Sequence, residues 1–456
     1  MIHTFSYKYK GTPFYFLWDI ESGSLHNVDY AAFLRAKNCF GLELSGPEKE
    51  DLAAIGPKEL ADIDAELDAL IAEGSLDAPK PKGEFRKNAS LVKALCLHIC
   101  HDCNMRCDYC FAGGGTYHTQ TEYMSAEVGK QAIDFLIKNS GGRRNLEADF
   151  FGGEPLLNLD TVKEIVEYAK IRGEEEGKNI TFTLTTNCLA LNKEAAVYLN
   201  ENMENVVLSL DGRKATHNAV RHAKNDKDIY DIIVKNAVDF RKIRGGKRYY
   251  VRGTFTAANL DFAGDIFALN DLGFDQISIE PVVLPDSHPL AIREEQVEEI
   301  KKEYERLAEG YIDRRKTDKW FNFFHFMIDL EHGPCVNKRL TGCGAGTEYM
   351  AVSPTGDLYP CHQFVGEKDY YIGNVKEGII NPEVRERFAS ISVLGKEYCS
   401  DCPAKYYCGG GCAANAKNFS GRLDGQYKIG CELLKKRLEL SLAIAYIEAL
   451  NEARPQ

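Results

Sequence analysis

The cysteines constrain this chain more than any other feature. There are 15 of them in 456 residues, gathered near residue 100 and between residues 343 and 431. So many thiols in a chain without a secretion signal are more often metal ligands than disulfides. Because a ligand sphere needs several converging sulfurs, this distribution predicts two separate metal regions.

The first group has the spacing C-x3-C-x2-C and consists of Cys103, Cys107 and Cys110. Three thiolates on one tight loop can hold three corners of a four-iron cluster and leave the fourth iron open. A structural zinc loop is the alternative, although zinc normally takes four protein ligands. Four other cysteines fit buried packing positions better than ligand positions: Cys39, Cys96, Cys100 and Cys188.

Strands and helices are predicted to alternate over residues 91–315. The predicted strands span residues 91–100, 146–151, 180–186, 206–210, 249–256 and 276–281. Six strand–helix units favour parallel strands with right-handed crossovers, so the expected fold class is α/β, a partial (β/α)6 TIM-like barrel. Functional groups are then expected at the C-terminal ends of the strands.

The first cysteine motif, with Tyr109 directly before its last cysteine, resembles the radical S-adenosylmethionine (SAM) superfamily. The resemblance implies that SAM chelates the open iron and is cleaved reductively to a 5′-deoxyadenosyl radical. It also implies a set of SAM-binding residues at the strand ends: Tyr109, Gly152, Gly153, Glu154, Thr185, Asn187, Ser209, Arg221 and Val283. Arg221 is expected to pair with the SAM carboxylate, and a surface salt bridge is its alternative role.

The second cysteine group resembles the SPASM extension of peptide-modifying radical SAM proteins. Its seven positions are Cys343, Cys361, Cys399, Cys402, Cys408, Cys412 and Cys431. The resemblance assigns Cys399, Cys402, Cys408 and Cys431 to an outer cluster, and Cys343, Cys361 and Cys412 to an inner one. A zinc ribbon would explain four cysteines but not seven. The expected cofactors are therefore three 4Fe-4S clusters and SAM.

The inner cluster has three evident ligands, so its fourth position stays open to two interpretations. Either Cys335 completes it, or one iron takes a cysteine thiolate from a substrate. His362 follows Cys361 where sulfatase-oxidising relatives carry an aspartate. The histidine argues against that activity here and is our candidate catalytic residue.

Four segments are expected: 1–77, a linker over 78–90, the barrel over 91–315, and an iron–sulfur SPASM domain over 316–456 that is loop-rich and ends in a helix. The first segment reads as a three-stranded meander followed by helices. It resembles the winged-helix-like leader-peptide recognition element. The resemblance implies that a leader peptide adds as a strand beside residues 24–28 and packs on the helix over residues 60–71.

The whole chain is most similar to the maturases of SCIFF (six-cysteine) peptides. The resemblance implies a thioether bond from a cysteine sulfur to a threonine of a Cys-rich precursor peptide, with an external electron donor such as ferredoxin or flavodoxin. Another peptide cross-link or oxidation is the alternative, followed by a non-enzymatic iron–sulfur protein. The net charge of −12 and the lack of a basic tract exclude nucleic acid as an expected partner. No membrane-spanning stretch is evident, so we expect a cytoplasmic protein.

Overall fold

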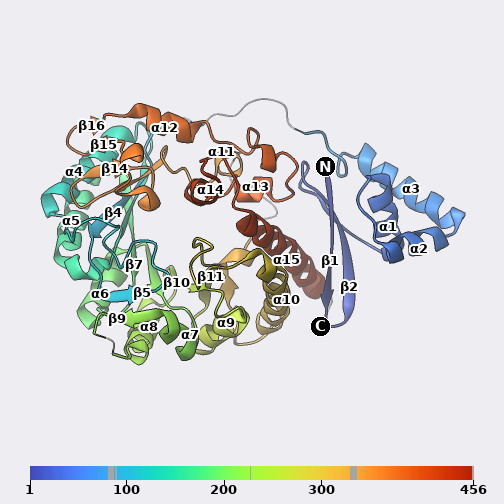
Figure 1. Cartoon of the computed structure of the whole chain (residues 1–456), viewed down its shortest axis with the longest axis horizontal. Coiled ribbons are helices and arrows are strands. Elements are labelled where there is room, and N and C mark those ends of the chain that lie inside the picture. The colour runs from blue at the N-terminus through green and yellow to red at the C-terminus, as the bar shows by residue number, and fades with distance from the viewer. Residues whose placement is uncertain (81–86, 88–89, 226, 329–335, 454–456) are drawn as a thin grey trace.

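Six parallel strands form the centre of an eleven-stranded sheet in the computed structural model, which describes residues 1–80, 87, 90–225, 227–328 and 336–453. In spatial order these strands are β4 (Ala94–Cys100), β6 (Asn145–Gly152), β7 (Asn179–Thr186), β8 (Asn205–Ser209), β10 (Tyr249–Phe255) and β11 (Gln276–Pro281). The sheet curves without closing, and helices cover its outside (Figure 1). This arrangement confirms the predicted partial barrel.

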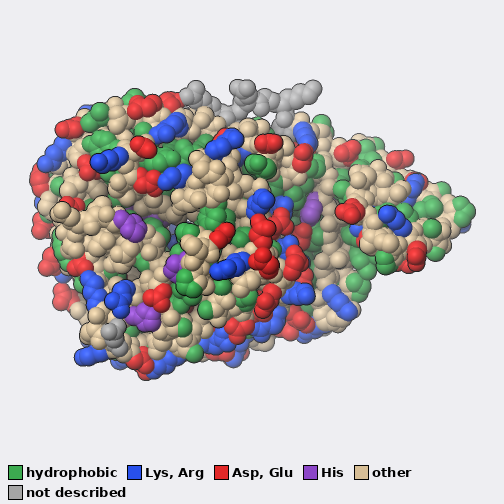
Figure 2. All heavy atoms as spheres, in the orientation of Figure 1, with side chains coloured by type: hydrophobic (Ala, Val, Ile, Leu, Met, Phe, Trp, Pro, Cys, Tyr) green, Lys and Arg blue, Asp and Glu red, His purple; other side chains and the backbone are tan. Residues whose placement is uncertain are grey.

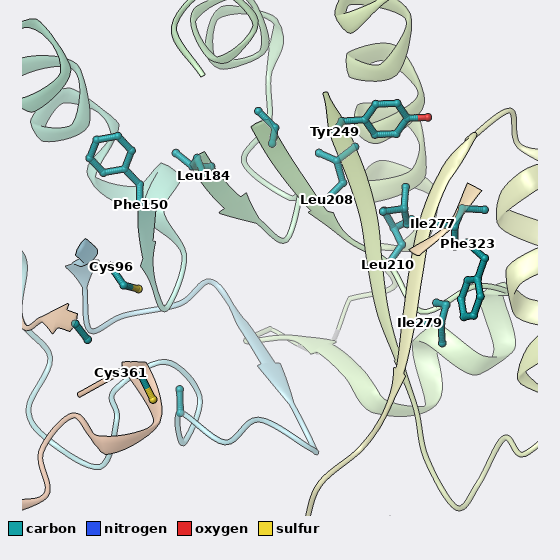
Figure 3. Packing of buried hydrophobic residues seen from close by; sticks show 14 of the residues in the cluster. Cys96, Phe150, Leu184, Leu208, Leu210, Tyr249, Ile277, Ile279, Phe323 and Cys361 are labelled. Atoms are coloured by element: carbon teal, nitrogen blue, oxygen red, sulfur yellow. The ribbon is translucent and has the colours of Figure 1, made fainter. Parts of the chain in front are cut away.

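The helices of the barrel follow its strands in the chain. They are α4 (Ala126–Asn139), α5 (Leu159–Glu175), α6 (Lys193–Asn202), α7 (Lys214–Val220), α8 (Tyr230–Arg244), α9 (Phe262–Asp271) and α10 (Val297–Arg314). Alternate strand residues point outward and pack against them, as Phe150, Leu184, Leu208 and Ile277 show on four strands (Figure 3). The intervening residues face the barrel interior, which places polar side chains there.

The C-terminal part of the chain extends the same sheet. After the short edge strand β12 (Asn322–Phe323), β13 (Tyr349–Val352) pairs in parallel with β4. The sheet then continues antiparallel through β14 (Asp357–Tyr359), β15 (Gly373–Asn374) and β16 (Gly378–Ile379). The region is rich in loops, as predicted, but β13 is part of the main core, because Met350, Ala351 and Val352 are fully buried.

Within the described residues, five α-helices complete the C-terminal part. They are α11 (Val336–Thr341), α12 (Pro382–Ala389), α13 (Lys405–Cys408), α14 (Ala413–Ser420) and the long α15 (Lys428–Ala453). Helix α15 packs along α10 and reaches the N-terminal sheet (Figure 1). Among the described residues, no helix combines the length and apolarity that crossing a bilayer requires.

The N-terminal lobe is a three-stranded antiparallel sheet with three helices. Its strands β1 (Ile2–Tyr9), β2 (Thr12–Asp19) and β3 (Leu25–Val28) pair in the order β1-β2-β3, so β3 is an edge strand. The helices are α1 (Tyr30–Cys39), α2 (Gly46–Ala54) and α3 (Pro57–Ala72). The sequence did not predict α2, which has a capping box at Ser45 but no buried residue and hence no apolar periodicity.

Both faces of the N-terminal sheet are covered. Phe5, Phe16 and Trp18 belong to the large core of the body, whereas Ile2 and Leu17 pack with the helices of the lobe. The alternation of inward and outward side chains along β1 and β2 therefore attaches one face to the body and the other to α1 and α3. The space-filling view shows a projecting lobe joined broadly to the body (Figure 2).

Candidate functional site

The first cysteine motif lies at the C-terminal end of the first barrel strand. Cys103 is in the loop after β4, and Cys107 ends β5 (Met105–Cys107), which pairs antiparallel with β9 (Arg221–Ala223). In that register Cys107 lies opposite Arg221. Burial, the Glu154 carboxylate and the thiolates of Cys107 and Cys110 raise the pKa of Cys103 to about 12. The three thiols are thus within electrostatic reach of one another, and Cys103 needs a nearby cation to be a thiolate at neutral pH.

Two glycines at the end of β6 lie against the loop that carries this motif. Gly152 has φ +124°, and a Cβ there would meet the carbonyl of Cys100. A Cβ on Gly153 would meet the carbonyl of Asp102, one residue before Cys103. The absence of side chains therefore lets the strand end lie directly beside the cysteine loop.

Replacing Gly153 by alanine is expected to weaken SAM binding by at least about tenfold, because the added methyl group must push the cysteine loop away from β6. Equilibrium dialysis with radiolabelled SAM under anaerobic conditions measures this. Gly142→Ala is the matched control, since a Cβ there has no atom within 4 Å. Equal affinity in the two variants would contradict the expectation.

Glu154 ties the ends of neighbouring strands together. Its carboxylate accepts hydrogen bonds from the Thr186 hydroxyl at 2.8 Å and the Asn187 amide at 2.7 Å, both at the end of β7. The Asn187 side chain in turn donates to Asn104 Oδ1 at 2.7 Å, inside the cysteine loop. Burial raises the pKa of Glu154 to about 7. The glutamate predicted to contact SAM thus also orders the residues around the cysteine loop.

Arg221, Asp211 and Tyr109 form a hydrogen-bonded group beside Cys107. Arg221 Nε and Nη2 donate to the two oxygens of Asp211 at 2.8 and 3.0 Å, and the Tyr109 hydroxyl donates to Asp211 at 2.7 Å. The Thr254 amide adds a fourth bond at 2.9 Å. Asp211 is fully buried and Arg221 is 8% exposed, so the predicted alternative of a surface salt bridge does not describe this pair.

These elements enclose a cavity of about 340 Å³ at the strand ends. Every residue that the sequence predicted to bind SAM contributes to its wall: Tyr109, Gly152, Gly153, Glu154, Thr185, Asn187, Ser209, Arg221 and Val283. The three cysteines of the first motif line it as well. The structure therefore brings the whole predicted set together in one place.

The same cavity has a wall from the C-terminal part of the chain. His362, Gln363 and Asn415 are among its lining residues. The His362 ring lies between Phe111 and Phe151, with ring centroids 5.4 and 5.3 Å away. Burial, with the nearby Arg252 charge, lowers its pKa to about 4, which makes the ring neutral at pH 7.

Three cysteines of the second region approach each other beside this wall. Burial raises the pKa of Cys361, and the thiolates of Cys412 and Cys343 raise it further. Glu280, which lines the cavity, contributes to the raised pKa of Cys412. This trio, predicted to hold the inner cluster, thus lies within electrostatic reach of the cavity. Cys335 falls outside the described residues.

The other four cysteines of the region form a second group. Burial and the thiolates of Cys431, Cys399 and Cys402 raise the pKa of Cys408 to about 11. Among the described residues, no three His, Cys, Asp or Glu side chains converge closely enough to hold a single metal ion.

Comparison with known proteins decides between these metal chemistries. Residues 97–252 match the model of the radical SAM superfamily, and residues 343–403 match SPASM, an iron-sulfur cluster-binding domain. The chain contains a radical SAM domain and a SPASM domain. Its cofactors are SAM and three iron–sulfur clusters, which is the number typical of SPASM-containing maturases.

The chain is homologous to maturases of sulfatases and peptides. It is 25% identical to a cysteine-type anaerobic sulfatase-maturating enzyme of Clostridium novyi, and the alignment covers 75% of this chain and 93% of that protein. It is 23% identical to the radical SAM cyclopropyl synthase TigE of Paramaledivibacter caminithermalis, and the alignment covers 75% of this chain and 72% of that protein. The structure of anSMEcpe with bound AdoMet and the Cp18Cys peptide has a TM-score of 0.64 at 19% identity, covering 79% of this chain and 99% of that one.

Some residues at the radical SAM site were not predicted as site residues. Asp211 lies ten positions before Arg221, but nothing in the spacing indicates that it accepts hydrogen bonds from both Arg221 and Tyr109. Asn415 is three residues after Cys412, and its position in the wall depends on how α14 packs. The only available signal was closeness in sequence to a predicted ligand.

Proposed function

We propose that this protein installs a thioether cross-link between a cysteine sulfur and a threonine of a Cys-rich precursor peptide. It is a radical SAM enzyme with homologues that modify peptides and proteins, and the thioether is the bond that we propose it makes. One observation carries the proposal: a single cavity is lined by residues of the radical SAM domain and by residues of the SPASM domain. A peptide in this cavity would lie between the SAM site and the inner cysteines.

The residues of this cavity have distinct proposed roles. Cys103, Cys107 and Cys110 would hold the SAM-binding cluster, and the nine predicted strand-end residues would orient SAM beside it. When bound, SAM and that cluster supply a 5′-deoxyadenosyl radical, which removes a hydrogen atom from carbon. Cys343, Cys361 and Cys412 would hold the inner cluster, and His362 remains the candidate catalytic residue, because its ring forms part of the cavity wall.

The proposed reaction removes two hydrogens from the peptide. A threonine C–H bond and a cysteine S–H bond break, and a C–S bond forms. The carbon-bound hydrogen leaves as an atom to the 5′-deoxyadenosyl group, and the thiol hydrogen leaves as a proton. The remaining electron requires an oxidised acceptor, for which the inner cysteines would provide the iron–sulfur centre. The four outer cysteines would hold a further cluster that passes the electron on.

Substrate recognition is proposed for the N-terminal lobe. β3 is an edge strand, so its outer side is free of a neighbouring strand within the lobe. On α3, Leu60 and Leu70 are half-buried and Ile71 is 40% exposed, which leaves apolar surface on that helix. A leader peptide could add to β3 by backbone hydrogen bonds and place apolar side chains on α3.

The test is mass spectrometry of a SCIFF-type six-cysteine precursor peptide after anaerobic incubation with the protein, SAM and dithionite. We expect a loss of two hydrogens, one thiol blocked from alkylation, and no modification of the same peptide without its leader. A mass change with all thiols still open to alkylation would contradict the thioether and favour another peptide oxidation. Absence of 5′-deoxyadenosine would contradict radical SAM catalysis altogether.

A further inference from the structure

We infer that Glu21 of the N-terminal lobe positions the loop that carries the outer cysteines. Glu21 lies in the turn between β2 and β3, and its partners Lys405 and Tyr406 lie in α13, between Cys402 and Cys408. The inference rests on the assignment of the outer cysteines to a cluster and is independent of which peptide bond the enzyme makes.

The contact is a buried ion pair between distant parts of the chain. Lys405 Nζ donates to Glu21 Oε1 at 2.6 Å, and the Tyr406 hydroxyl donates to Glu21 Oε2 at 2.7 Å. The Lys405 and Glu21 side chains are only 4% and 1% exposed. Such a pair needs both partners, since either charge alone would be left buried without compensation.

Lys405 transmits this contact to the cysteine loop. Its Nζ also donates to the carbonyl of Ser400, between Cys399 and Cys402, and its backbone amide donates to the carbonyl of Cys402. The Cys408 amide closes the next turn by donating to the Ala404 carbonyl. Three of the four outer cysteines thus lie on a short segment whose central cation is held by Glu21.

The turn that carries Glu21 is itself fixed. Asp19 is fully buried and accepts hydrogen bonds from the amides of Glu21 and Ser22 at 3.4 Å each and from the Ala78 amide at 3.0 Å. The N-terminal ammonium donates to it at 3.3 Å. The lobe therefore presents the Glu21 carboxylate from an ordered turn, which is the property that a positioning residue needs.

A second ion pair between the same two regions provides a matched control. Lys80 Nζ lies 2.7 Å from Asp401, but these side chains are 55% and 76% exposed. Solvent screening makes such a pair weak. The structure therefore offers two contacts for comparison. The buried Glu21–Lys405 pair is expected to matter for the cluster, and the exposed Lys80–Asp401 pair is not expected to matter.

The experiment compares Glu21→Gln with Lys80→Gln in anaerobically purified holoenzyme. We expect the outer cluster of Glu21→Gln to lose iron to a chelator at least about tenfold faster than wild type, whereas Lys80→Gln stays within about twofold. Redox titration by electron paramagnetic resonance should show a more positive potential for the outer cluster. Its reduction adds negative charge, which the unpaired Lys405 cation favours once Glu21 is neutral.

Iron release and a potential for Glu21→Gln that match Lys80→Gln would overturn the inference. If Glu21→Gln cannot be purified, Tyr406→Phe takes its place, because it removes one hydrogen bond and keeps the ion pair. Its outer cluster should release iron about threefold faster, and an unchanged rate would again overturn the inference. These readouts do not involve peptide product, so a wrong thioether assignment would leave them unaffected.

Discussion

Replacing Cys103, Cys107 and Cys110 together by alanine is expected to abolish 5′-deoxyadenosine formation and to lower the iron content from about twelve to about eight per chain. The three thiols line the cavity and lie within electrostatic reach of one another. Without them no protein ligand remains for the cluster to which SAM would bind, and the two clusters of the SPASM domain should persist. Iron and sulfide analysis with chromatography of SAM products measures both effects.

Cys39→Ala is the control for this triple variant. Cys39 is an exposed thiol in the N-terminal lobe, so the prediction that it is buried was wrong, and it lies outside both cysteine regions. It should retain full iron and full 5′-deoxyadenosine formation. A triple variant that still cleaves SAM reductively, or one that loses iron from all three clusters, would contradict the separation of the cysteines into independent groups.

Replacing Asp211 by alanine is expected to destabilise the radical SAM domain by about 3–5 kcal/mol, because Arg221 would keep a buried charge without its partner. SAM binding should weaken as well, since Arg221 and Tyr109 both lose the group that orients them. Thermal unfolding of the anaerobic protein, followed together with SAM dialysis, measures the two consequences. Tyr109→Phe removes one donor to a charged acceptor and should cost about 1.5–3 kcal/mol. Equal melting of the Asp211→Ala variant and wild type would contradict the proposed arrangement.

The same pair sets a pH dependence at the acid end. Burial alone would raise the pKa of Asp211, but the charge and hydrogen bonds of Arg221 outweigh it and lower this pKa below its ordinary value. A carboxyl with a lowered pKa contributes stability that is present above its unfolded pKa of about 3.9 and is lost as the pH falls through the folded value. The contribution of Asp211 should therefore be complete at neutral pH and disappear only below about pH 4.

The N-terminal sheet is held in a defined position against the body of the protein. One face of its sheet belongs to the core of the body, through Phe5, Phe16 and Trp18. The Tyr446 hydroxyl of α15 donates to Asn27 of β3 at 3.1 Å, so the edge strand has a defined position relative to the body. A leader bound to β3 would therefore start from a fixed point with respect to the radical SAM cavity.

The sequence by itself determined the local chemistry and the order of the elements. The C-x3-C-x2-C spacing, the seven later cysteines and the glycines after the second barrel strand are local patterns, and each specifies ligand chemistry without knowledge of the fold. Alternating strands and helices specified a parallel sheet, because crossovers of that length have few alternatives. α2 was missed, since a helix without a buried face leaves no apolar period to detect.

Only the tertiary structure decided how these pieces meet. Three features link residues whose separation in the chain does not indicate how close they lie in the fold. They are the Asp211–Arg221–Tyr109 group, the pairing of β13 with β4, and the Glu21–Lys405 pair. Strand pairing and buried charge pairs depend on which surfaces lose water together, and that is a property of the assembled core. The shared cavity of the radical SAM and SPASM domains is likewise a product of packing. The sequence predicted the SAM-binding residues and the first three cysteines that line it, but not that they would meet residues of the SPASM domain there.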